Sequence, residues 1–135
     1  MTQPLQFFEY QDGVLSADGI SLKEIAEQIG TPTYIYSERA LLTPFRELKK
    51  GLQDLDVTLC FAIKSNPNLS ILKTLVQEGA GLDIVSGGEL YRASLAGVPG
   101  ERVVFSGVGK TLAEVHSALV FHDGRGMKSF NVESI

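Results

Sequence analysis

Cysteine is almost absent from this chain of 135 residues, which contains one, Cys60. A single cysteine excludes a disulfide bond within the chain. Cys60 lies in a strand-like apolar run, so we expect a small, buried and reduced side chain. Free cysteine of this kind is typical of a reducing compartment, and we therefore expect a cytoplasmic protein.

An excess of positive charge and long apolar runs are absent as well. Lysine and arginine number 12 against 16 aspartates and glutamates, which gives a formal net charge of −4. This balance argues against a nucleic-acid or anionic-membrane partner. No stretch approaches the roughly 18 consecutive apolar residues of a membrane span, and residues 1–6 lack the basic and apolar segments of a secretory leader. With 44% hydrophobic and 21% charged residues, we expect a globular protein with a small-molecule ligand.

Metal and nucleotide motifs fail on their spacing. His116 and His122 have no Cys, Asp or Glu arrangement typical of a metal site, so we assign no metal. Gly109-Lys110-Thr111 resembles the end of a phosphate-binding P-loop, but Val104 stands where that motif requires a glycine. Neither a metal nor a nucleotide is indicated.

The sequence does contain, from residue 57 onward, a regular alternation of strand-like and helix-like segments. The strand-like segments are short, rich in Val, Ile, Leu and Phe, and followed by small or polar residues, as expected when both faces of a sheet are covered. The alternation predicts a parallel sheet with helical connections. Its segments are residues 57–63, 68–78, 82–85, 86–96, 102–105, 111–121 and 128–133.

Capping residues support the predicted helices. Ser86 precedes Glu89, and Thr111 precedes Glu114, by the three residues of a capping box. In that box the hydroxyl and the carboxylate each accept a hydrogen bond from a free backbone N–H group of the helix start. Gly97 suits the opposite end of a helix.

The first 36 residues follow a different pattern. We expect a hairpin, a short helix and a strand there, at residues 7–15, 21–30 and 33–36. A soft boundary near Tyr36 then divides the chain into residues 1–36 and 37–135. After it, Ser37 begins a helix whose apolar stripe over residues 41–55 should pack on the sheet.

Polar residues follow successive predicted strands, namely Lys64, Ser86, Ser106 and Ser134. We expect them to gather at the carboxyl edge of the sheet, where ligands bind in barrels and doubly wound sheets. The apolar run before Lys64 can partly desolvate its ammonium and favour the neutral amine that attacks a carbonyl. A solvated lysine that ends the strand is the alternative, and the residues alone leave both open.

Asp83 lies among apolar residues on the next predicted strand, where a carboxylate needs a partner. A salt bridge, with Lys64 as one possible partner, and a bound cofactor are equally consistent with the sequence. Ser86 and Gly87-Gly88 offer N–H groups at a helix start. For them, ordinary capping is favoured over anion binding.

The segment Phe61-Ala62-Ile63-Lys64-Ser65-Asn66-Pro67-Asn68 resembles the cofactor-attachment segment of the fold-type III pyridoxal-phosphate decarboxylases. Further stretches resemble the diaminopimelate decarboxylase branch of that family, so the resemblance spans nearly the whole chain. These are residues 81–90, 98–99, 102–111 and 130–134.

This resemblance implies an α/β fold. Residues 37–135 would be the first four βα units of an alanine-racemase-like (β/α)8 TIM barrel, and residues 1–36 would belong to a separate β domain. The resemblance also implies pyridoxal phosphate as the cofactor, Lys64 as the catalytic lysine that carries it, and Ala62 and Asp83 as its neighbours. A homodimer is implied for the full-length parent.

The activity that the resemblance implies is decarboxylation of meso-diaminopimelate, an amino acid, to L-lysine and CO2, the last step of lysine biosynthesis. A related basic-amino-acid decarboxylase stays an alternative. So does a non-catalytic module that pairs with a full-length decarboxylase.

A (β/α)8 barrel needs roughly 250 residues, so we expect this chain to be an amino-terminal fragment that is inactive alone. Its unclosed sheet would leave strand edges and apolar surface exposed. The isolated chain should therefore aggregate or need a partner chain, and should release no CO2 from diaminopimelate. Size-exclusion chromatography and denaturant unfolding test this, and a soluble monomer with a cooperative transition would contradict it.

Overall fold

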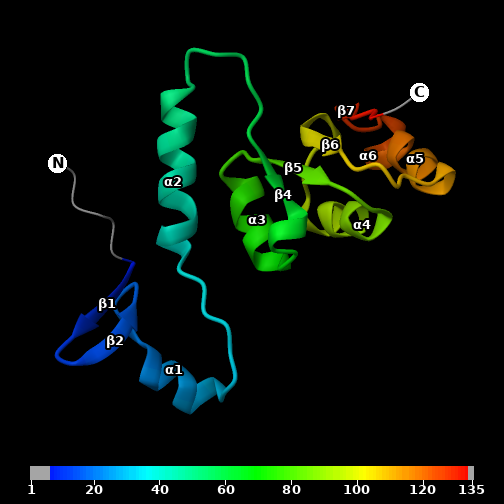
Figure 1. Ribbon diagram of the computed structural model, residues 1–135. Helices are drawn as coiled ribbons and strands as arrows, with labels where there is room; N and C mark the ends of the chain where they lie inside the picture. Colours follow the sequence, from blue (N-terminus) through cyan, green and yellow to red (C-terminus); the bar gives the residue numbers. More distant parts are fainter. Residues whose placement is uncertain (1–6, 134–135) are drawn as a thin grey trace. The chain divides into compact units, whose positions relative to one another are not determined.

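A computed structural model describes residues 7–133, which fall into two compact units with the boundary along the chain between Leu55 and Asp56 (Figure 1). The first unit holds a small antiparallel sheet and two helices, and the second holds a parallel sheet with helical connections. The mixed α/β class expected from the sequence is confirmed. The division of the parent into domains at Tyr36 stays a prediction.

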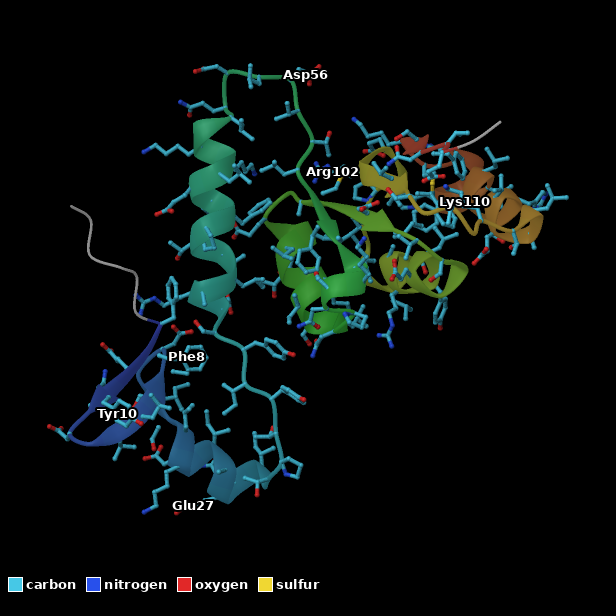
Figure 2. All side chains as sticks on the ribbon, viewed as in Figure 1. Phe8, Tyr10, Glu27, Asp56, Arg102 and Lys110 are labelled. Atoms are coloured by element: carbon cyan, nitrogen blue, oxygen red, sulfur yellow. The ribbon has the colours of Figure 1, made fainter. Side chains whose placement is uncertain are left out.

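The first unit begins with three antiparallel strands, β1 (Phe8–Gln11), β2 (Val14–Ala17) and β3 (Ile20–Ser21). Strands β1 and β2 are joined through Asp12 and Gly13, whose φ angles of 50° and 79° are left-handed. Two successive left-handed residues give the turn twist that suits a hairpin. The predicted hairpin is therefore confirmed, with Phe8 and Tyr10 on β1 (Figure 2).

The two helices of this unit begin at the predicted serines. Helix α1 (Leu22–Ile29) is capped by Ser21, whose Oγ accepts from Glu24 N at 3.3 Å. Helix α2 (Glu38–Gly51) is capped by Ser37, whose Oγ accepts from Ala40 N at 2.9 Å. How the apolar stripe of α2 packs stays a prediction.

Residues 33–36 do not form the predicted strand. They have no regular secondary structure, and Tyr34 is 90% exposed. Strand structure depends on ladder pairing rather than on local propensity, and within residues 7–133 this segment pairs with no strand.

The second unit contains a four-stranded parallel sheet in the order β4, β5, β6, β7 (Figure 1). The strands are β4 (Cys60–Ala62), β5 (Gly81–Ile84), β6 (Val103–Phe105) and β7 (Ser129–Phe130). The connections are the 3-10 turn η1 (Ile63–Ser65), helices α3 (Leu69–Gln77) and α4 (Gly87–Ala96), the 3-10 turn η2 (Gly100–Arg102), and helices α5 (Leu112–Leu119) and α6 (Phe121–Gly124). The predicted parallel sheet is confirmed.

Strand β4 is shorter than predicted at both ends. Its ladder with β5 runs from the pair Cys60 and Gly81 to the pair Ala62 and Asp83. Ile63 then enters η1, and Asn66 N donates to Ile63 O at 3.0 Å. A strand extends only as far as its partner allows, so the apolar residues before Cys60 lie outside the ladder. Lys64 consequently lies in a turn beyond the strand.

One face of this sheet carries the core. Leu82, Ile84, Val103 and Phe105 are all 0% exposed and pack with residues of α3, α4 and α5, which cover this face. Fully burying a phenylalanine or leucine side chain contributes about 1.5–3 kcal/mol. The alternate residues on these strands face the other way, because successive side chains of a strand point to opposite faces.

The predicted helix caps are present with one difference. Thr111 and Glu114 form the complete capping box of α5. Ser86 caps α4 by accepting from Glu89 N at 3.3 Å, but the Glu89 carboxylate accepts from Val85 N at 2.8 Å instead of from the cap residue. The reciprocal box expected at Ser86 is therefore wrong, because the Glu89 carboxylate binds the N–H group of Val85 and not that of Ser86.

Gly81 is required by close packing at the start of β5. A β-carbon there would collide with the carbonyl oxygen of Arg102 and would lie 2.7 Å from Cys60 Sγ. Overpacking of this kind costs about 1–3 kcal/mol. In urea titrations of the gene product that contains this chain, Gly81→Ala should lower the free energy of unfolding by that amount.

Gly109→Ala is the matched control, because a β-carbon at Gly109 meets nothing within 4 Å. Its expected effect is within about 0.5 kcal/mol. Equal effects of the two substitutions would refute the packing role of Gly81.

Candidate functional site

The carboxyl edge of the parallel sheet brings together most of the predicted site residues. Lys64 lies in η1, directly after β4, and Ser86 and Ser106 follow β5 and β6. Ser134 lies outside the described residues. Lys64 is exposed, which agrees with the solvated alternative and not with desolvation by the apolar run before it. Within residues 7–133, its Nζ has no hydrogen bond or ion pair.

The sheet face opposite the core has a floor of small side chains. Ala62 is in register with Asp83, and Asp83 with Val104, so these three side chains share this face. Cys60 and Gly81 form the next register pair on it. Cys60, Ala62 and Gly81 are small, and Asp83 supplies a carboxylate on the same face.

Among residues 7–133, Asp83 is held by a hydroxyl and not by a cation. Ser106 Oγ donates to Asp83 Oδ1 at 2.6 Å, and Asn131 Nδ2 donates to Ser106 Oγ at 2.9 Å. The salt bridge between Asp83 and Lys64 considered from the sequence is not formed between these two described residues. Asn131 was missed at the sequence level, although its place at the end of the last predicted strand could have indicated it.

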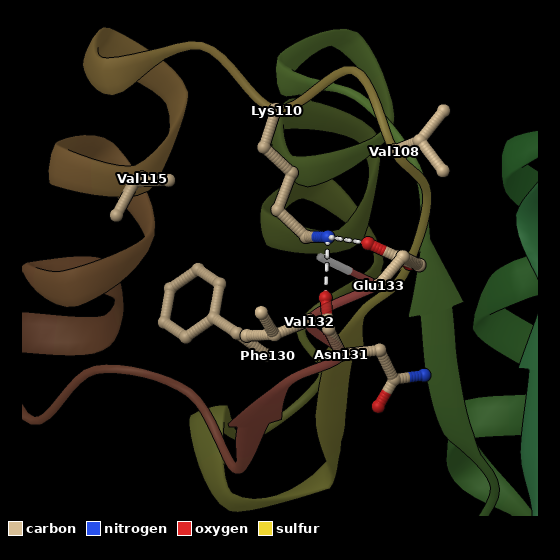
Figure 3. A pocket seen from close by; sticks show the side chains of 7 residues that line it. All are labelled: Val108, Lys110, Val115, Phe130, Asn131, Val132 and Glu133. Carbon is tan, nitrogen blue, oxygen red and sulfur yellow. Dashed lines mark hydrogen bonds and ion pairs between the residues drawn. The ribbon is translucent and has the colours of Figure 1, made fainter. Parts of the chain in front are cut away.

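Lys110 was also missed, because only its resemblance to a P-loop lysine was considered. Its side chain is 12% exposed, and its ammonium lies 5.7 Å from the centre of the Phe105 ring. Nζ donates to Gly107 O, to Asn131 O at 2.6 Å and to Glu133 Oε2 at 3.5 Å. Figure 3 shows this ammonium bonded to Asn131 and Glu133. All three residues line a cavity of about 340 Å³. Lys110 thus ties the loop after β6 to the end of β7.

Cys60 is half-buried rather than fully buried, because it lies on the face away from the core. Burial raises the pKa of its thiol, the negative charge of Asp83 raises it further, and Lys128 opposes this shift. The thiol is therefore kept protonated and poorly nucleophilic.

The carboxylate of Glu114 binds at the start of α4. Glu114 Oε1 accepts from Gly87 N at 2.7 Å, and Glu114 Oε2 accepts from Thr111 N at 2.9 Å. These hydrogen bonds, with that from the Thr111 hydroxyl, lower the pKa of Glu114. The capping role expected for Ser86 is confirmed, and the neighbouring Gly87 N–H is occupied by Glu114.

Residues 7–133 contain neither a metal-binding cluster nor a helix that could span a membrane. No group of three or more His, Cys, Asp and Glu side chains there is arranged to hold a metal ion. No helix in that range is long and apolar enough to cross a membrane.

Comparison with known families shows which family the chain belongs to. A family model described as "Pyridoxal-dependent decarboxylase, pyridoxal binding domain" matches residues 39–134. The chain belongs to this family. The predicted family relationship is confirmed.

Similar proteins of known name or known structure support the assignment to the pyridoxal-dependent decarboxylase family. The chain is 45% identical over 127 residues to a diaminopimelate decarboxylase of Pseudomonas fluorescens, covering 94% of this chain and 30% of that protein. A crystal structure from Aquifex aeolicus matches with a TM-score of 0.86 and 46% identity, over 95% of this chain and 31% of that one. The structure of diaminopimelate decarboxylase from M. jannaschii in co-complex with L-lysine matches with a TM-score of 0.83 and 34% identity. This match covers 96% of this chain and 30% of that chain. This chain thus spans about 30% of the length of these relatives.

The carboxyl edge fits the pyridoxal group that this family binds. An aldehyde cofactor needs an accessible amine, and Lys64 Nζ is exposed and has no partner among the described residues. A flat ring needs space beside the strands, and Ala62 has a small side chain on the face away from the core. Asp83 lies next to Ala62 in register and supplies a negative charge.

Glu114 gives this edge a dependence on pH that can be measured. Because its pKa in the folded protein lies below the ordinary value of 4.5, the stability it provides is complete above that value and is lost as pH falls through the lower folded pKa. Glu114→Gln keeps an acceptor oxygen but loses the charge. In the gene product that contains this chain, its urea midpoint should therefore be below that of the wild type at about pH 7.

The difference in midpoint should shrink as the pH falls below 4.5. Glu101→Gln, at an exposed position, controls for the change in net charge. A midpoint difference for Glu114→Gln that is the same at every pH would contradict the assigned role.

Proposed function

We propose that this chain forms the first part of the pyridoxal-phosphate-binding (β/α)8 barrel of a diaminopimelate decarboxylase, with Lys64 as the lysine that holds the cofactor. Residues 1–36 would belong to its β domain. The complete enzyme would act in the cytoplasm as a homodimer and convert meso-diaminopimelate to L-lysine and CO2.

The observation that carries this proposal is the position of Lys64 at the carboxyl edge of the sheet. Lys64 lies two residues after Ala62, and Ala62 is in register with Asp83. In parallel barrels, reactive groups gather at this edge because every strand ends there. Among the polar residues of this edge, Lys64 carries the free amine, while the amine of Lys110 is bound to backbone carbonyls and Glu133.

Each residue has a task that follows from its chemistry. Lys64 would bind the cofactor covalently through Nζ and give way to the amino group of the substrate. Ala62 would leave room for the ring, and Asp83 would face its polar atoms or the attached nitrogen. When bound, pyridoxal phosphate supplies an acceptor for the electron pair left behind as CO2 departs.

The proposed substrate is supported by the relatives. The protein from Pseudomonas fluorescens is named diaminopimelate decarboxylase. The structure from M. jannaschii holds L-lysine, which is the product of that reaction. Both relatives match over more than nine-tenths of this chain. A basic-amino-acid decarboxylase of different specificity is the competing assignment.

Lys64→Ala tests the assigned lysine in the gene product that contains this chain. After incubation with pyridoxal phosphate and reduction with borohydride, peptide mapping should find the cofactor on Lys64 in the wild type. Lys64→Ala should lose this label, the visible absorbance of the bound cofactor and CO2 release, because the covalent bond is gone.

Lys73→Ala is the matched control, since Lys73 is an exposed lysine of α3. It should keep label, absorbance and activity. Labelling at another lysine in the wild type would overturn the assignment of Lys64. Release of CO2 from ornithine or arginine in preference to diaminopimelate would overturn the proposed substrate.

A further inference from the structure

We propose that Ser106 and Asn131 are positioning residues that fix one oxygen of Asp83 beside the cofactor. This inference rests on the proposed function, because it assigns Asp83 to the cofactor site. It extends that site from the first two strands of the parallel sheet to all four strands of this unit.

The sheet register places the three side chains on one face. Asp83 is in register with Val104, and Val104 with Ser129. Ser106 and Asn131 each follow by two residues along their own chain segments, and a step of two returns a side chain to the same face. The row Asp83, Ser106 and Asn131 therefore runs across the carboxyl edge on the side away from the core.

Backbone hydrogen bonds fix the positions of these residues. Ser106 N donates to Ile84 O at 2.8 Å, which ties Ser106 to the residue after Asp83. Asn131 N donates to Phe105 O at 2.9 Å, which ties Asn131 to the residue before Ser106. Lys110 Nζ holds Asn131 from the other side through its carbonyl oxygen. With the backbone held at both points, little side-chain freedom is lost when the hydrogen bonds form.

The hydrogen bonds have one direction. The side-chain nitrogen of Asn131 can only donate, so it takes a lone pair of Ser106 Oγ. The single hydroxyl proton of Ser106 is then directed to Asp83 Oδ1, at 2.6 Å. This bond engages Oδ1 and leaves Oδ2 as the oxygen that meets a ligand. The amide of Asn131 thus orients Asp83 without touching it.

Three variants of the gene product that contains this chain test the row. Ser106→Ala removes the donor to Asp83. Asn131→Asp keeps the shape but replaces a donor by an acceptor, which should draw the Ser106 proton away from Asp83. Ser106→Thr keeps the hydroxyl and should restore most of the cofactor affinity that Ser106→Ala loses. Ser117→Ala is the matched control, because the Ser117 hydroxyl donates only within α5, to Ala113 O.

The measurements are the affinity of the apoprotein for pyridoxal phosphate, the pH dependence of the visible absorbance of bound cofactor, and CO2 release. At metal sites, removing a residue that orients a metal ligand costs about 10- to 100-fold in affinity or activity, which sets the scale expected here. We expect Ser106→Ala and Asn131→Asp each to weaken cofactor affinity about tenfold and to shift the absorbance profile. Ser106→Thr should regain most of the cofactor affinity that Ser106→Ala loses, and Ser117→Ala should match the wild type.

A double variant separates orientation from general damage to the fold. In the Ser106→Ala background, Asn131→Asp should have almost no further effect on affinity or on the absorbance profile, because the hydroxyl that couples the two residues is gone. Additive losses would overturn the row. Urea unfolding of each apoprotein identifies a variant that merely loses structure. If Ser106→Ala is such a variant, the folded Ser106→Thr protein tests the role of the hydroxyl instead.

Failure of this inference can be told apart from failure of the proposed function. If Lys64 carries the cofactor but Ser106→Ala and Asn131→Asp leave affinity and absorbance profile unchanged, the row is refuted and the function stands. If Ser106→Thr behaves as Ser106→Ala, the hydroxyl is not what matters, and the row is refuted as well. If no cofactor attaches to Lys64, the proposed function itself is wrong.

Discussion

The pairing register of the parallel sheet is the constraint on which the second unit depends. Register pairs such as Phe61 with Leu82, and Leu82 with Val103, keep one face apolar and covered by helices. A slip of one residue would turn that whole set to the other face. The same register puts Ala62 and Asp83 together on the open face. Core and candidate site are thus two consequences of one alignment.

The carboxyl edge of this sheet has many polar groups, and most of them are occupied by the chain itself. Glu89 and Glu114 take the N–H groups of Val85 and Gly87, and Lys110 is held by carbonyl groups. Buried or half-buried polar groups must be paired in this way, since leaving them unpaired is costly. The exposed amine of Lys64 differs from these groups by having no partner within residues 7–133. That contrast is what supports a role for Lys64 toward a ligand.

Local chemistry explains which features could be predicted. The helices at Ser21, Ser37, Ser86 and Thr111 were correct because a capping side chain acts within its own segment. The prediction of a strand at residues 33–36 is wrong, and the predicted range for β4 is too long. Both differences arise because the bounds of a strand depend on a partner strand that the segment itself does not contain. The Glu89 carboxylate missed its expected N–H group by one residue, which only the actual turn geometry decides.

The sequence alone determined the alternation of strands and helices, the carboxyl-edge position of Lys64, and the family, because periodicity, capping and a contiguous motif are all local. Only the tertiary structure decided the partner of Asp83. Ser106 and Asn131 lie 23 and 48 residues farther along the chain, and nothing in their local sequence links them to that carboxylate. They meet it because parallel strands bring equivalent positions of distant segments to the same edge, and this pairing is set by burial of the opposite face.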